Sequence, residues 1–342
     1  MTSRELVSRT LRFDKPARVP RQLWLLPWAE EHHPAALASI RERFPDDLID
    51  APSFFRTPPA TSGEEHRPGW FIDEWGCRFF NRQSGVIGEV KEPRLADWRD
   101  WRAVRVPVER LSVDASRVNA FCEATDRFVL ARTSARPFER LQFIRRSDNL
   151  YLDLADPPDE FFRLLGRIHD FYKAELELWA RTAVDALFFM DDWGSQNMLL
   201  VSPASWRRIF KPLYRDYIDI AHRNGKAAFM HSDGHIEAIL PDLVELGLDA
   251  LNSQLFCMDI EAVGRRFAGR LTFWGEIDRQ RLLPFGTPEK VAAAVDRVGR
   301  ALWRGGGVIA QCEWGKDNSP ENVETVFDAW MENLTADREG AA

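Results

Sequence analysis

The stretch KAAFMHSDGHIEAILPDLVELG, residues 226–247, decides the fold. Its first part is a short apolar run that ends in polar residues and a glycine, which predicts a strand over 226–234. Its second part has apolar residues at helical spacing, which predicts a helix over 235–247. A strand followed directly by a helix is the unit from which parallel sheets are built.

The same alternation of strand and helix continues along the chain. Further strands are predicted over 127–133, 185–194, 248–254, 270–278 and 307–315, and two earlier ones over 18–26 and 47–54. Helices are predicted over 158–182, 202–225, 258–269, 287–306 and 319–334. Eight such strands predict an α/β fold of the (β/α)₈ barrel type, formed as one domain over residues 1–342. Residues 55–125, rich in Pro, Trp and Gly, are expected to be an irregular insertion.

Composition and charge exclude several classes of partner. The chain has a net charge of −7 and no long basic run, so a nucleic-acid partner is not expected. No apolar run approaches the roughly 18 residues that a bilayer span requires, and the N-terminal segment lacks the apolar core of a signal peptide. The four cysteines are scattered and are expected to be free thiols. We therefore expect a cytoplasmic protein with no membrane partner.

Polar residues end five consecutive predicted strands. In barrels of this type the chemistry takes place where the strands end, so these residues are expected to share one site. They are Asp191, Asp192, His231, Asp233, Gln254, Glu276, Asp278, Cys312 and Glu313.

Several roles are open for these residues. His231, Asp233 and Cys312 carry imidazole, carboxylate and thiol groups, all of which are zinc ligands in proteins. A hydrogen-bonding or acid/base role for the histidine and aspartate is the alternative to a metal site. We expect catalytic roles for Asp192, Glu276 and Glu313, and substrate contacts from Asp191, Trp193, Gln254, Arg145 and Trp24. Structural roles are also open for some of these residues. One of the two adjacent aspartates could cap a helix, Arg145 could lie in solvent, and Trp24 could pack in the core.

A series of motifs resembles the uroporphyrinogen decarboxylase superfamily, in order and over nearly the whole chain. The motifs are DEWGC (73–77), FERLQFIRRSDNLYLDL (138–154), DDWGSQ (191–196), SPASWRRIFKPLY (202–214), HSDG (231–234) and FWGEID (273–278). The resemblance implies a (β/α)₈ barrel. The decarboxylases have an N-terminal signature similar to RQAGRY, of which only Arg21 and Gln22 are present here. Because a highly anionic tetrapyrrole needs several fixed cations, this departure argues against uroporphyrinogen decarboxylation.

The other branch of the superfamily contains methyltransferases of corrinoid-dependent demethylation systems. Their zinc site resembles His-x-Cys followed about eighty residues later by Cys; His231 and Cys312 match it, with Asp233 in the middle position. The resemblance implies a zinc-dependent methyltransferase that moves a methyl group between a small O- or N-methyl compound and cobalamin. The cobalamin would be free or carried by a corrinoid protein. The alternatives are a metal-free decarboxylase or lyase and a non-catalytic binder of a small molecule or corrinoid.

Overall fold

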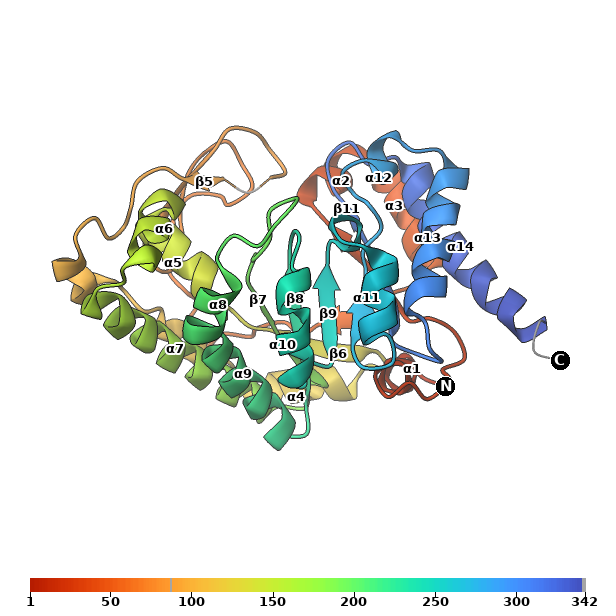
Figure 1. The fold of residues 1–342 in the computed structure, drawn as a ribbon, viewed down its shortest axis with the longest axis horizontal. Coiled ribbons are helices and arrows are strands. Elements are labelled where there is room, and N and C mark those ends of the chain that lie inside the picture. The colour runs from red at the N-terminus through yellow and green to blue at the C-terminus, as the bar shows by residue number, and fades with distance from the viewer. Residues whose placement is uncertain (87, 340–342) are drawn as a thin grey trace.

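Eight parallel strands form a nearly closed barrel surrounded by helices in the computed structural model, which describes residues 1–86 and 88–339 (Figure 1). The strands run around the barrel in the order β1 (Arg21–Leu25), β11 (Val308–Trp314), β10 (Thr272–Trp274), β9 (Ala250–Ser253), β8 (Ala227–Ser232), β7 (Ala186–Met190), β6 (Phe128–Arg132) and β2 (Leu48–Asp50). Each corresponds to a strand predicted from the sequence, so the predicted (β/α)₈ fold is confirmed. Within the described residues, the helices are all too short or too polar to cross a membrane.

The barrel has one seam, between β1 and β2, where no ladder of backbone hydrogen bonds forms. Aspartate side chains bind the free N–H groups of β1 instead: Asp46 accepts from Leu23 at 2.7 Å, and Asp47 accepts from Arg21 at 2.9 Å. The side chain of Gln22 donates to the carbonyl of Leu48 at 3.3 Å. These bonds satisfy backbone groups that would otherwise be buried without partners.

Side chains alternate strictly between the barrel interior and the helix layer. Phe188, Phe229, Ala250, Trp274 and Ile309 come from five neighbouring strands and form one interior cluster with residues of β2 and β6. The residues next to them in sequence belong to a larger cluster between the strands and the helices. This period of two is the geometry of a β-strand, and it decides which strand-end residues face the barrel mouth.

The helices form the outer layer of the molecule (Figure 1). They are α1 (Ser3–Leu11), α2 (Pro27–His32), α3 (Pro34–Arg43), α5 (Pro137–Arg145), α6 (Ser147–Ala155), α7 (Asp159–Ala180), α8 (Pro203–Ile209), α9 (Lys211–Arg223), α10 (Leu240–Glu245), α11 (Ile260–Phe267), α12 (Leu282–Phe285), α13 (Pro288–Leu302) and α14 (Pro320–Glu339), with short 3₁₀ turns at Glu237–Ile239 and Leu255–Cys257. The helix predicted over 202–225 is two helices that meet at Phe210, because Pro212 has no N–H to continue the first one.

The segment 55–125 is more regular than the sequence predicted. It contains an antiparallel sheet of β3 (Gly69–Ile72), β4 (Arg78–Asn81) and β5 (Glu89–Val90), the 3₁₀ helices Trp98–Ala103 and Val108–Ser112, and α4 (Ala115–Glu123). Asp73 anchors it: one carboxylate oxygen accepts from the backbone of Trp75 and Cys77, and the other binds Arg140 of α5. Arg146, between α5 and α6, donates to the carbonyl of Lys91 just after β5 at 2.9 Å, so β5 lies near these two helices at one end of the molecule (Figure 1).

Candidate functional site

The alternation of side chains separates the predicted site residues into two sets. His231 and Glu313 lie two and four residues after the interior residues Phe229 and Ile309, and so have interior parity. Cys312 has the opposite parity and belongs to the cluster between the barrel and the helices. The interior set is Trp24, Asp192, His231, Asp233, Gln254, Glu276 and Glu313, and the outer set is Asp191, Trp193 and Cys312.

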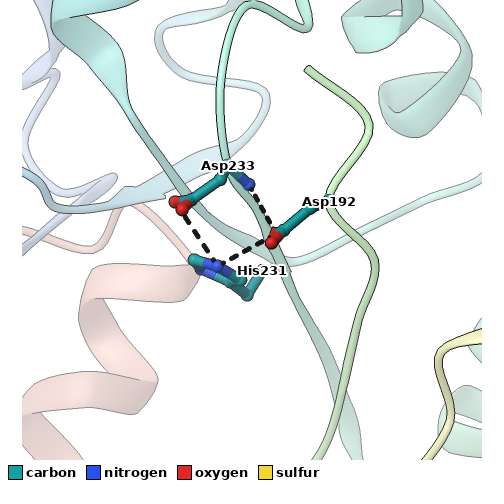
Figure 2. A group of neighbouring side chains, drawn as sticks. All are labelled: Asp192, His231 and Asp233. Carbon is teal, nitrogen blue, oxygen red and sulfur yellow. Dashed lines mark hydrogen bonds and ion pairs between the residues drawn. The ribbon is translucent and has the colours of Figure 1, made fainter. Parts of the chain in front are cut away.

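Asp192, His231 and Asp233 form a compact group at the barrel mouth (Figure 2). Nε2 of His231 lies 3.4 Å from Oδ1 of Asp192 and 3.5 Å from Oδ1 of Asp233. One potential ligand atom from each residue lies within 4.8 Å of the other two. Asp192 also accepts the backbone N–H of Asp233 at 3.0 Å, which holds the two strand ends together.

Two glycines allow these strand ends to approach so closely. Gly194 donates its N–H to the carbonyl of Asp233 at 3.0 Å. A Cβ on Gly234, which has a φ of +79°, would lie 2.2 Å from the backbone of Gly194. The glycines of the DDWG and HSDG motifs are therefore required for contact between the loops that follow β7 and β8.

The imidazole of His231 is fixed in one orientation. Its Nδ1 lies 2.5 Å from Oδ1 of Asn252, and the amide nitrogen of Asn252 donates to the carbonyl of Trp274. Because that bond turns the amide oxygen toward His231, Nδ1 carries a proton and Nε2 points at the two aspartates. The ring of Trp24 packs on the imidazole with 5.6 Å between centroids.

The carboxylates control the charge of the group. Burial lowers the pKa of His231, but the hydrogen bond and charge of Asp192 and the charge of Asp233 outweigh burial and raise it to about 9. Burial raises the pKa of Asp192, yet its bond to His231 prevails and lowers it to about 2. When no metal ion is bound, His231 is therefore a positively charged imidazolium that lies between the carboxylates of Asp192 and Asp233.

The three residues fit a divalent metal ion. Oδ1 of Asp233 is buried and has no hydrogen-bond partner, while its other oxygen is bound by Arg279. Metal-binding histidines usually donate their second ring N–H to an oxygen, as His231 does to Asn252. Imidazole nitrogen and carboxylate oxygen are both zinc ligands. Asp192, His231 and Asp233 would be the ligands.

The set predicted from the sequence contained Cys312, whereas the structure brings Asp192 to His231 and Asp233 and does not bring Cys312 there. The Cys312 side chain is fully buried on the outer face of β11, beside Leu23 of β1 in the strand register. Burial also raises the pKa of the thiol well above its ordinary value.

Arg279 links the acidic residues of the mouth. Besides Asp233, its guanidinium contacts Oε1 of Glu313 at 2.6 Å and Oε2 of Glu276 at 3.3 Å. Burial raises the pKa of Glu276 to about 8, although Arg279 opposes the shift. The sequence did not indicate Arg279, because this residue lies in the loop after β10. In a loop, the spacing of residues does not predict the direction in which a side chain points.

Glu139 is a second residue that the sequence did not indicate. It lies in the first turn of α5, and its backbone N–H donates to Asp191 at 2.8 Å. Burial raises the pKa of its carboxyl to about 7 despite the nearby charge of Arg136, and Oε2 is buried without a partner. Glu139 and Glu276 are thus two acids that titrate near neutral pH.

Three residues predicted to contact substrate have structural contacts instead. Asp191 accepts the N–H groups of Phe138 at 2.9 Å and Glu139 at 2.8 Å and the hydroxyl of Tyr214 at 2.5 Å, so it caps α5.

The other two are Trp193 and Arg145. Trp193 is fully buried and stacks on Phe138. Arg145 pairs with Asp153 at 2.8 Å and donates to the carbonyls of Leu95 and Ala96. The structure therefore does not bring these three residues to the mouth, and the polar groups of all three bind other parts of the chain, that of Trp193 donating to the Tyr214 hydroxyl at 2.9 Å.

Two pockets adjoin the mouth. One, of about 200 Å³, is lined by Gln254, Glu276 and Arg279 among others. The second, of about 530 Å³, lies along the β1–β2 seam and is lined by Trp24 and Glu313 among others. The ion pair between Arg279 and Glu313 joins the walls of the two pockets.

Comparison with known proteins agrees with the observed fold. A solved methyltransferase from Methanosarcina mazei superposes with a TM-score of 0.68 at 16% identity, covering 98% of this chain and 99% of that one. An endo-β-1,4-xylanase from Gloeophyllum trabeum superposes with a TM-score of 0.46 at 10% identity, covering 94% of this chain and 99% of that one. A search of curated proteins finds no match. At 16% identity the likeness to the methyltransferase shows the fold only.

The family is established by sequence. The model of the uroporphyrinogen decarboxylase (URO-D) family matches residues 80–332, which is most of the chain and includes Asp192, His231 and Asp233. The resemblance inferred from the motifs is thereby confirmed, and the chain belongs to the uroporphyrinogen decarboxylase (URO-D) family.

Proposed function

We propose that this protein is a metal-dependent methyltransferase of a corrinoid-linked demethylation system. It would move a methyl group between a small O- or N-methyl compound and cobalamin, which enters as a substrate, free or on a partner corrinoid protein. The observation that carries the proposal is the group of Asp192, His231 and Asp233, with an oriented imidazole and a buried carboxylate oxygen that accepts no hydrogen bond. Zinc is the metal we expect.

The ligand set favours particular methyl donors. When bound, the metal would supply a Lewis acid that polarises the heteroatom carrying the methyl group. One imidazole and two carboxylates make a harder site than thiolates do, and hard sites prefer oxygen and nitrogen over sulfur. The harder ligand set supports methyl ethers or methylamines as methyl donors, and it argues against a thiol as the substrate that the metal binds.

The remaining residues of the site would orient the metal ligands and protonate the product. Arg279 binds the outer oxygen of Asp233 and so leaves Oδ1 directed at His231. Loss of a methyl group leaves a basic oxygen or nitrogen that takes up a proton, and acids with pKa values near 7 and 8 suit that step at neutral pH. Glu139 and Glu276 are the acids in this range. The Trp24 ring, 5.6 Å from the imidazole between centroids, would help to hold the imidazole in this orientation.

A metal-free decarboxylase is the second candidate, favoured by the same two near-neutral acids and by the family. A polycarboxylated tetrapyrrole would need unpaired cations at the mouth. Arg21 instead donates to the carbonyl of Pro45, on the exposed side of β1, and Arg132 pairs with Asp50 at 2.7 Å. These contacts support the methyltransferase over the decarboxylase.

The test combines metal analysis with turnover. Protein purified without a metal-affinity tag should contain about one zinc per chain by mass spectrometry. With methyl ethers or methylamines and cob(I)alamin it should form methylcobalamin, which is followed by its absorption spectrum. A chain that binds no metal after reconstitution and releases CO₂ from a porphyrinogen would establish the decarboxylase instead.

A further inference from the structure

A pocket of about 200 Å³ opens beside the metal-binding group. Its walls come from three loops that follow β7, β9 and β10: Gln196 and Asn197, then Gln254–Cys257, then Glu276–Arg281. Two wall residues contact the segment that carries Asp233. Gln254 accepts the N–H of Gly234 at 3.0 Å, and Arg279 binds the Asp233 carboxylate. A molecule in this pocket would therefore lie next to the proposed metal.

The wall contains a carboxyl group with an unused oxygen. The Glu276 side chain is only 3% exposed. Its Oε2 lies 3.3 Å from Nε of Arg279, whereas Oε1 is buried and has no hydrogen-bond partner. Buried polar atoms in folded proteins nearly always have a partner, so a bound molecule is expected to supply one.

The charge of the wall indicates an uncharged ligand. Its two acids, Glu276 and Asp278, equal in number its two bases, Arg279 and Arg281. One carboxylate oxygen of Asp278 is occupied by the N–H groups of Gln280 and Arg281, at 3.0 and 2.9 Å. Apolar wall is supplied by Leu255, Phe256 and Ile277.

We propose that this pocket binds a small, uncharged alcohol or phenol whose hydroxyl group hydrogen-bonds to Glu276. A hydroxyl both donates and accepts, so it pairs with the carboxyl group in either protonation state. An alcohol or phenol is also the product that removal of a methyl group from an ether leaves. Identifying the pocket ligand with that product rests on the proposed function, and it selects methyl ethers over methylamines as donors.

The probes are phenol and toluene, which have nearly the same shape and differ by a hydroxyl in place of a methyl. Binding of each to the full-length protein is measured by ligand-detected NMR titration. We expect phenol to bind at least tenfold more tightly than toluene, because a site built around a hydroxyl partner rejects an analogue that lacks it. Glu276→Leu should remove the preference, and Glu276→Gln, which retains an oxygen of similar position, should retain part of it.

Glu261→Leu, on the exposed surface of α11, is the matched control and should bind both probes like the wild type. Equal affinity for the two probes in wild type, or a preference that persists in Glu276→Leu, overturns the proposal. Circular dichroism checks that each variant is folded. Metal content is measured on the same samples. A phenol preference without bound metal would refute the metal-dependent methyltransferase and leave the pocket proposal standing. Bound metal without a phenol preference would overturn the pocket proposal and leave the metal-dependent function standing.

Discussion

His231 and Asn252 are joined by a 2.5 Å contact between Nδ1 and Oδ1, at adjacent positions of β8 and β9 in the barrel. The strand register places them opposite each other, and the bond from Asn252 to the Trp274 carbonyl extends the chain of contacts to β10. Three neighbouring strands thus fix one nitrogen of His231. The result is a histidine whose free nitrogen is directed at Asp192 and Asp233 before any metal arrives.

The first prediction concerns this support. Asn252→Ala should lower metal affinity by about 10–100-fold, the usual cost of removing a residue that orients a metal-binding histidine. The change is measured by competition with a chromogenic chelator at fixed pH. Asn224→Ala, which removes an amide from the C-terminal end of α9, is the matched control and should bind metal normally. Equal affinity in the two variants would show that Asn252 does not orient a ligand.

The second prediction separates the ligand set that we propose from the structure from the one expected from the sequence. Asp192→Asn and His231→Ala should each lose most of the bound metal, because each removes one ligand of the group. Cys312→Ser should retain about one metal per chain, because Cys312 lies on the other face of its strand. Metal loss is measured by mass spectrometry after dialysis, with Cys122→Ser as the matched thiol control. Metal loss in Cys312→Ser alone would restore the sequence-based assignment.

The sequence was sufficient for the fold and for identifying the strand ends that meet at the barrel mouth. Apolar runs ending in polar residues located all eight strands, and the barrel rule placed their ends together. What the sequence did not provide is the face of each strand. His231 follows the apolar run AAFM and Cys312 follows VIA after one glutamine, and local composition does not distinguish inward from outward positions. The strand register and the two buried clusters supply that information.

Arg279 and Glu139 could not be found from the sequence for a different reason. Both lie just outside strands, one in a loop and one at the start of a helix, so no periodicity fixes the direction of their side chains. Their positions depend on tertiary partners: three carboxylates for Arg279 and the Asp191 cap for Glu139.

The third prediction tests the structural role of Asp191. Asp191→Ala leaves three buried donors without an acceptor: the N–H groups of Phe138 and Glu139 and the Tyr214 hydroxyl. We expect the free energy of unfolding to fall by about 3 kcal/mol, since each unsatisfied buried donor costs on the order of 1 kcal/mol or more. Tyr214→Phe, which removes one donor, should cost about 1 kcal/mol. Both are measured by urea denaturation. A fully stable Asp191→Ala that fails to bind substrate would return this residue to the substrate site.

The fourth prediction concerns pH and the seam between β1 and β2. Burial raises the pKa of Asp46 to about 6 in the folded protein, from an unfolded value of about 3.9. The folded state therefore holds the proton more tightly. The stability that this provides is complete below about pH 4 and is lost as pH rises through 6, because above that value folding buries a carboxylate. Asp46→Asn retains an oxygen for the N–H of Leu23 and removes the charge.

We accordingly expect Asp46→Asn to match the wild type in stability near pH 4. At pH 7.5 it should exceed the wild type by about 1–2 kcal/mol in free energy of unfolding. Asp47→Asn is the matched control with the opposite expectation, because Asp47 is paired with Arg18 at 2.6 Å and its removal should destabilise the protein at pH 7.5. Urea unfolding of all three proteins at both pH values decides the matter. A constant difference between Asp46→Asn and wild type at the two pH values would mean that Asp46 has the same pKa in the folded and unfolded protein, and that burial at the seam does not raise it.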